Sequence, residues 1–233
     1  MTDPVCVIIG VGPGNGQAFA AKFAEAGYRV ALLSRSTDTL DAMAAEMPKC
    51  QAFHCDAADP ASVRGALDAA AAAFGPADVL LYNAGGGVFG TIDDVDLEMM
   101  DYSWRVNVQG LAAAAQHLAP GMIERGRGTI LVTGATASLR GGARFAAFAQ
   151  AKAAQRSLAQ SMAKHWGPKG LHVALLIVDG VIDLSRTRRM LPDRADDGFL
   201  APADIAETVY FICHQPRSAW TFEVDVRPYA EQW

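Results

Sequence analysis

The sequence predicts a doubly wound α/β fold, with one parallel sheet between two layers of helices, in a single domain over residues 1–233. Short apolar runs alternate along the chain with helix-favouring segments, as strands buried on both faces of a parallel sheet do. A glycine-rich turn follows the first apolar run. No repeat or linker interrupts the 233 residues, and single α/β sheets commonly reach this length.

Each predicted element has its own signal. Strands are expected at the apolar runs 5–9, 30–33, 51–55, 78–82, 129–133, 172–178 and 221–226. Gly27 ends the first helix, Asp59 and Pro60 provide the N-cap and first position of another, and the glycines after Trp166 end a long one. Sheets of this type bind ligands where the strands end, so the loops after the strands are the candidate site.

The composition excludes several classes of partner. A net charge of −5 offers no basic surface for nucleic acid or an anionic membrane. No apolar stretch approaches the ~20 residues of a membrane helix. The N-terminal segment has an acid at Asp3 and no basic region, so we expect no signal peptide and a cytoplasmic protein. The cysteines and histidines lack metal-ligand spacing, and we expect no metal.

A glycine-rich turn, GVGPGNGQAFA, follows the first predicted strand. Gly10, Gly12, Gly14 and Gly16 allow a tight turn and a close approach of the backbone to a pyrophosphate. The next helix is expected from about Asn15, and its N-terminal amides would point at that charge. Glycines also serve ordinary turns, but their place after the first strand favours a dinucleotide site.

The end of the second strand indicates which dinucleotide is bound. An acid is expected here when the ribose carries a free 2′-hydroxyl, but the chain has Ser34 and Arg35. An arginine suits a 2′-phosphate through charge-assisted hydrogen bonds. The alternative is a plain surface arginine at a strand end. We therefore predict NADP(H) as the preferred cofactor, with NAD(H) as the other possibility.

With these features the chain resembles the short-chain dehydrogenase/reductase family over essentially its whole length. The matching positions are Gly10, Gly14 and Gly16 in the turn, Asp56 and Ala57 after the third strand, Asn83, Ala84 and Gly85 after the fourth, Asn107 in a long helix, and Lys152. The resemblance implies that the acid at position 56 contacts adenine, with the next backbone group beside the same ring. It also implies that Lys152 contacts the nicotinamide ribose.

The resemblance fails at two catalytic positions. In the family, a tyrosine four residues before the lysine acts as general acid or base, and the lysine lowers its pKa. Here that residue is Phe148, which has no proton to give, and the family's serine is replaced by Ala135. The hydroxyls of Thr136 and Ser138 are candidate substitutes that either orient a substrate or hydrogen-bond within the loop.

Two further sites have alternative interpretations. In the resembled family the asparagine corresponding to Asn107 helps to hold a water that relays protons; alternatively, it satisfies a helix distortion. After the sixth strand only Gly180 of the family pattern remains, and the backbone of Ile182 or its neighbour is expected to contact the nicotinamide. Asp179 in that loop is either a catalytic carboxylate or a group that pins the loop.

Two functions fit these residues. One is an NADP(H)-dependent oxidoreductase with a non-standard active site and a small-molecule substrate. The alternative is a catalytically silent NADPH-binding protein that acts as a sensor or partner subunit. Residues 185–200, which would shape the substrate pocket, contain no motif that identifies a substrate. Two apolar helices, around residues 110–119 and 153–163, form a dimer bundle in the resembled family, so we expect a homodimer or homotetramer.

Overall fold

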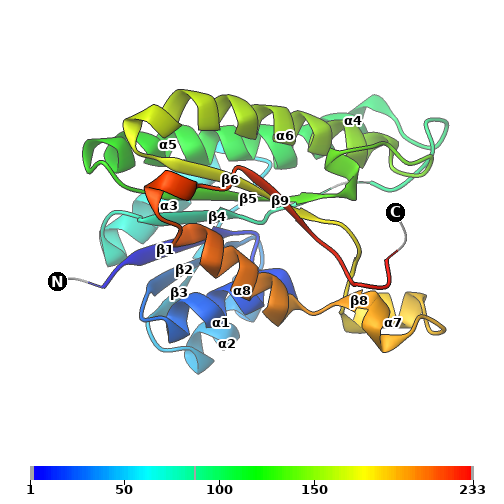
Figure 1. Ribbon diagram of the computed structural model, residues 1–233, viewed down its shortest axis with the longest axis horizontal. Coiled ribbons are helices and arrows are strands. Elements are labelled where there is room, and N and C mark those ends of the chain that lie inside the picture. Colours follow the sequence, from blue (N-terminus) through cyan, green and yellow to red (C-terminus); the bar gives the residue numbers. More distant parts are fainter. Residues whose placement is uncertain (1–2, 87, 232–233) are drawn as a thin grey trace.

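A computed structural model describes residues 3–86 and 88–231 and contains the predicted parallel sheet (Figure 1). The strand order is β3-β2-β1-β4-β5-β6-β9, and every neighbouring pair runs parallel. The strands are β1 (Val5–Ile9), β2 (Arg29–Ser34), β3 (Cys50–His54), β4 (Val79–Tyr82), β5 (Thr129–Ala135), β6 (His172–Val178) and β9 (Glu223–Val226). The predicted fold class is confirmed, and the strand bounds differ from the predicted ones only at their ends.

Helices cover both faces of the sheet (Figure 1). One layer contains α3 (Pro60–Phe74), α4 (Leu97–Trp104), α5 (Gly110–Glu124) and α6 (Ala146–Trp166), and the other contains α1 (Asn15–Glu25), α2 (Thr37–Glu46) and α8 (Pro202–Cys213). Alternate side chains of β1 divide between the layers, because successive strand residues point to opposite faces. Val7 and Ile9 join one hydrophobic core, and Cys6 and Ile8 join the other.

The predicted helix signals are present in the structure. Gly27 has a φ of 91° and follows the end of α1, a backbone conformation that favours glycine. The Asp59 carboxylate accepts a hydrogen bond from the Ala61 N–H at 2.9 Å and caps α3. Gly170, with a φ of 88°, turns the chain after α6.

Two features were not predicted. The long helix around Asn107 is divided by a π-helical turn, Arg105–Gln109, that joins α4 to α5. Such turns often mark functional sites. In addition, β7 (Val181–Ile182) and β8 (Phe199–Leu200) form a small second sheet, with the short helix α7 (Ser185–Met190) between them.

The part of the chain that the structure describes lacks a membrane-spanning helix and a metal-binding cluster. Every helix in residues 3–86 and 88–231 is too short or too polar to cross a bilayer. The same residues contain no group of three or more His, Cys, Asp or Glu side chains that could hold a metal ion.

Candidate functional site

The glycine-rich turn lies between β1 and α1, against the exit of β4. Gly10 has a φ of 94°, and a Cβ atom there would stand 2.3 Å from the Ala84 backbone nitrogen. The Asn83 side chain donates a hydrogen bond to the Gly10 carbonyl at 2.8 Å. The sequence order of the sheet reverses at this point, and the resulting crevice is where such folds bind ligands.

The turn has the shape that a pyrophosphate requires. A Cβ atom at Gly16 would lie 2.7 Å from the Val11 Cα, so only glycine fits there. A Cβ atom at Gly12 would meet nothing within 4 Å, which leaves that backbone open to a ligand. The buried Asn15 Oδ1 has no hydrogen-bond partner at the start of α1. An open backbone at a helix N-terminus fits an anionic cofactor.

Arg35 and Asp56 lie at the ends of neighbouring strands, β2 and β3. The exposed Arg35 guanidinium donates a hydrogen bond to the Tyr102 hydroxyl on α4 at 3.2 Å. The Asp56 carboxylate accepts from the Ala58 N–H at 2.9 Å, within its own turn, and Ala57 lies between them. The two predicted adenosine-end residues are therefore at the same edge of the sheet, beside the glycine-rich turn.

Lys152 is buried at the centre of the site, with 4% of its surface exposed. Its ammonium donates to the Thr133 carbonyl at 2.8 Å and to the Gln155 Oε1 at 2.9 Å. The Gln155 amide in turn donates to the Asn107 carbonyl at 2.8 Å. Burial lowers the pKa of Lys152 to about 7, because the charged form loses its hydration.

Asn107 connects the π-helical turn to the exit of β4. Its side-chain nitrogen donates to the Ser103 carbonyl at 2.8 Å and to the Gly86 carbonyl at 2.6 Å. The bond to Ser103 corresponds to the interpretation in which the Asn107 side chain provides a hydrogen-bond partner at a helix distortion. A Cβ atom at Gly85 would lie 3.7 Å from the Lys152 nitrogen and 4.0 Å from the Asn107 Oδ1. These groups therefore converge on Gly85.

Two buried oxygens beside the lysine lack partners in the structure. The Asn107 Oδ1 and the Thr133 Oγ1 make no hydrogen bond, although both are buried. A buried polar atom without a partner is costly. The hydroxyls of a nicotinamide ribose, or water, have the hydrogen-bonding capacity to satisfy them. This donor and acceptor set fits the nicotinamide half of the cofactor.

Phe148 lies beside Lys152, and Ala135 is the last residue of β5; the resemblance predicts hydroxyl groups at these two positions. The Phe148 ring centroid is 5.8 Å from the lysine nitrogen, one turn away on α6. The Ala135 N–H donates to the Ser138 Oγ at 3.1 Å, and the Thr136 hydroxyl donates to Asp179 at 2.5 Å. Both candidate substitute hydroxyls thus have structural partners, and their contact with a substrate stays a prediction.

The loop after β6 is held by Asp179. Besides Thr136, its carboxylate lies 3.9 Å from Arg140 and 3.5 Å from Arg227. This arrangement corresponds to the interpretation in which Asp179 pins the loop. Gly180 packs against Pro228, because a Cβ atom there would stand 2.7 Å from the proline Cδ.

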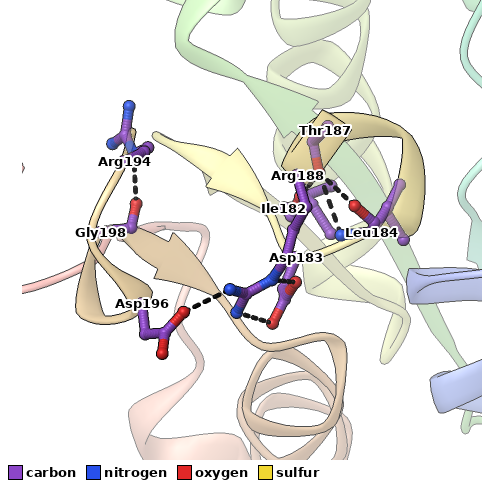
Figure 2. A network of polar contacts seen from close by, with 8 residues as sticks. All are labelled: Ile182, Asp183, Leu184, Thr187, Arg188, Arg194, Asp196 and Gly198. Carbon is purple, nitrogen blue, oxygen red and sulfur yellow. Dashed lines mark hydrogen bonds and ion pairs between the residues drawn. The ribbon is translucent and has the colours of Figure 1, made fainter. Parts of the chain in front are cut away.

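The following segment crosses to the glycine-rich turn and carries Ile182, which is expected to contact the nicotinamide. The Ile182 carbonyl accepts from the Thr187 hydroxyl at 2.6 Å. The Leu184 side chain fills the space that a Cβ atom at Gly14 would need, at 2.7 Å. Figure 2 shows how Arg188 holds this segment: it contacts both Asp183 oxygens, at 2.6 and 2.8 Å, and the Asp196 carboxylate.

Several site residues escaped prediction. Gln155 is three residues from Lys152, a spacing that places two side chains on the same helix face and could have indicated it. Tyr102 accepts a hydrogen bond from Arg35, and nothing in its local sequence predicts this contact. Phe89 and Phe145 form ring contacts next to Phe148, which only the folded chain brings together.

Comparison with known proteins gives one consistent family. The sequence matches the family model described as short chain dehydrogenase over residues 4–193. It is 31% identical, over 80% of this chain and 87% of the other, to the inactive 2-(S)-hydroxypropyl-CoM dehydrogenase 2 of Xanthobacter autotrophicus. Among solved structures, a short-chain dehydrogenase from Rhodopseudomonas palustris is 35% identical, with a TM-score of 0.83 over 97% of this chain and 99% of the other. A metagenomic short-chain oxidoreductase in complex with NADP is 26% identical, with a TM-score of 0.85 over 99% of both chains.

Proposed function

Because the chain belongs to the short-chain dehydrogenase family, we propose that it is an NADP(H)-dependent oxidoreductase with a non-standard active site. The observation that carries this proposal is the buried Lys152, which lies against Gly85, close to the segment that binds the glycine-rich turn, and 5.8 Å from the centroid of the Phe148 ring. The similarity to the metagenomic short-chain oxidoreductase that was solved in complex with NADP supports the choice of nucleotide.

Each part of the site has a role in binding. The glycine-rich turn holds the pyrophosphate, Arg35 neutralises the 2′-phosphate, and Lys152 with Asn107 holds the nicotinamide ribose. When bound, the cofactor supplies or accepts a hydride. The protein then orients the substrate and excludes water. Without a phenol at position 148, the site lacks general-acid help worth roughly 10²–10⁴ in rate.

The missing hydroxyls also favour a second candidate, a silent NADPH-binding protein that acts as a sensor or partner subunit. The residues at the tyrosine and serine positions are Phe148 and Ala135, while the cofactor-binding residues are in place. The similarity to the inactive 2-(S)-hydroxypropyl-CoM dehydrogenase 2 supports this candidate. The two candidates predict the same binding and different turnover.

Calorimetric titration tests the cofactor choice. We expect NADPH to bind at least tenfold more tightly than NADH, about 1.4 kcal/mol. Arg35→Ala should remove most of this difference and leave NADH affinity nearly unchanged. Arg127→Ala is the matched control. This exposed arginine lies just before β5, at the opposite end of the strands from the glycine-rich turn. Equal affinities for the two cofactors in the unmodified protein would contradict the proposal.

Consumption of NADPH with a panel of carbonyl acceptors separates the two candidates. The oxidoreductase oxidises NADPH only when an acceptor is present and releases a reduced product. The silent protein binds NADPH with the same affinity and consumes none of it. A protein that binds neither nucleotide would overturn both candidates.

A further inference from the structure

Three phenylalanine rings form an exposed cluster beside the lysine. The Phe89 ring lies 5.4 Å from that of Phe145 and 5.6 Å from that of Phe148, with edge-to-face angles of 80° and 63°. Phe89 is 61% exposed and Phe145 is 42% exposed. Contiguous exposed aromatic side chains mark binding surfaces more often than ordinary surface. We call these three residues the phenylalanine cluster.

The path of the chain places the phenylalanine cluster at the nicotinamide end of the site. After β4, Asn83 binds the glycine-rich turn, Gly85 lies against Lys152, and Phe89 reaches the other two rings. The segment is fixed there because the Gly90 N–H donates to the Arg144 carbonyl at 2.9 Å. The cluster therefore runs outward from the buried lysine to the surface, where a substrate would enter.

The same site restricts the chemistry of its substrate. The Phe148 ring has no acidic proton, the Thr136 hydroxyl donates to Asp179, and Ser138 is buried against the Ala135 N–H. Two of the three Lys152 N–H groups donate to protein oxygens, and the proposed function gives the third to the nicotinamide ribose. A saturated ketone that accepts a hydride becomes an alkoxide, whose conjugate acid has a pKa near that of water and far above that of a phenol. A quinone becomes a phenolate, whose conjugate acid has a pKa of about 10. The phenolate is the weaker base of the two anions, so it persists without immediate protonation.

We infer that the substrate is a planar, apolar, conjugated carbonyl compound of the quinone class, an inference that rests on the oxidoreductase function proposed above. The quinone takes two electrons and one hydrogen nucleus as hydride from NADPH, which becomes NADP⁺. The C–H bond of NADPH breaks and an O–H bond forms at one quinone oxygen, while the other oxygen stays on the ring as a phenolate. The phenolate takes one proton from water, which releases hydroxide to the buffer and gives the hydroquinone. The phenylalanine cluster packs against the planar ring and positions it.

Binding to the NADP⁺-saturated protein tests this inference without turnover. The probe is 2,3-dimethyl-1,4-naphthoquinone, in which both ring positions that a thiol could attack are blocked, and calorimetry gives its Kd. Aromatic contacts contribute about 0.5–1.5 kcal/mol each, so Phe89→Ala should weaken binding roughly two- to tenfold. Phe211→Ala, which removes a 66% exposed ring from α8, is the matched control and should not change the Kd.

Turnover and assembly complete the test. We expect NADPH oxidation with the naphthoquinone to be at least tenfold faster than with 1-decalone, a saturated ketone with the same two-ring skeleton. Faster reduction of decalone, or an unchanged Kd in Phe89→Ala, would overturn the substrate class while leaving the oxidoreductase function intact. Phe89→Ala should sediment like the parent, and a change in assembly state would instead assign the cluster to a subunit contact. Failure to bind NADPH at all would overturn the proposed function itself.

Discussion

At the scale of single residues, the presence of a phenyl ring and not a phenol at position 148 limits what Lys152 can do. A cation 5.8 Å from the ring centroid has a weak attraction to the ring face, and no acidic group is there for it to activate. The lysine is instead held by Thr133 and Gln155. We expect that its remaining function in this arrangement is to hold a nucleotide.

Restoring the two hydroxyls tests this view. Phe148→Tyr places a phenol next to Lys152, whose positive charge would lower the phenol pKa from about 10. Ala135→Ser returns the second hydrogen-bond donor. If the parent is a slow enzyme, the double variant should reduce simple ketones with NADPH up to about 10²-fold faster, the lower end of the general-acid contribution. Steady-state assays of the parent, both single variants and the double variant give this factor.

The silent-protein alternative predicts no gain in the same assay, with NADPH affinity retained. A parent that already reduces ketones at ordinary rates, about 10 s⁻¹, would contradict both accounts. Another group would then supply the proton, and Thr136, Ser138 and Asp179 would be examined first.

The buried lysine predicts a pH dependence of stability. Its pKa is about 7 in the folded protein and about 10.4 in an unfolded chain, so the unfolded state binds more protons between these values. The contribution of Lys152 to stability therefore rises with pH across this window and is least favourable below pH 7. Urea denaturation should show that Lys152→Met gains stability relative to the parent at pH 6 and loses that advantage by pH 10. A difference that does not change with pH would contradict this prediction.

Gln155→Glu provides a second measurement of the same property. A carboxylate in place of the amide oxygen, 2.9 Å from the ammonium, favours the charged lysine and should raise its pKa. The lysine side-chain NMR resonances report this value directly. Gln160→Glu, on the same helix and outside this network, should leave it unchanged.

At the scale of elements, one side chain joins the two loops that flank α7. Arg188 joins Asp183 to Asp196 across the segment (Figure 2). Arg188→Ala should make the amides of residues 183–198 exchange hydrogen roughly two- to fivefold faster, because exposed ion pairs have modest strength. Arg189→Ala, at the next exposed position, is the control. Hydrogen-exchange mass spectrometry measures both, and equal effects would assign no special role to Arg188.

The elements also show how far sequence reasoning reaches. The strands were predicted because buried parallel strands need continuous apolar runs, which are visible locally. The two-residue strands β7 and β8 were not, because their pairing depends on backbone contacts rather than on side-chain pattern. The π-helical turn escaped because one extra residue hardly alters the helical periodicity.

The candidate site likewise contains residues that the sequence predicts and residues that it does not. The glycines, Arg35 and Lys152 were predicted because each occupies a fixed place after a strand or within a motif. Gln155 was not, because its role depends on the Asn107 carbonyl, 48 residues away in the sequence. The phenylalanine cluster likewise exists only once the segments after β4 and before α6 are side by side.

At the scale of the whole molecule, we propose that the chain assembles through α5 and α6. The exposed face of α6 presents small side chains at Ala153, Ser157 and Ser161, which lie one turn apart and allow another helix to approach closely. Sedimentation at micromolar concentration should show a species larger than the 24.6 kDa monomer. Ser157→Arg should shift it toward the monomer, whereas Ser218→Arg, exposed and outside both helices, should not. A monomeric parent would refute the proposal.

The contact between Leu184 and Gly14 has a consequence for the kinetics of cofactor capture. The leucine lies against the turn along which a dinucleotide would bind, and its segment is tied by Arg188. A dinucleotide arriving at this turn finds the backbone open at Gly12 and covered by Leu184 at Gly14, so full capture would require the segment to lift first. The observed association rate should then level off at high nucleotide concentration, at the opening rate of the segment, instead of rising in proportion to encounter. The cofactor, once enclosed, would leave at a rate set by the same movement.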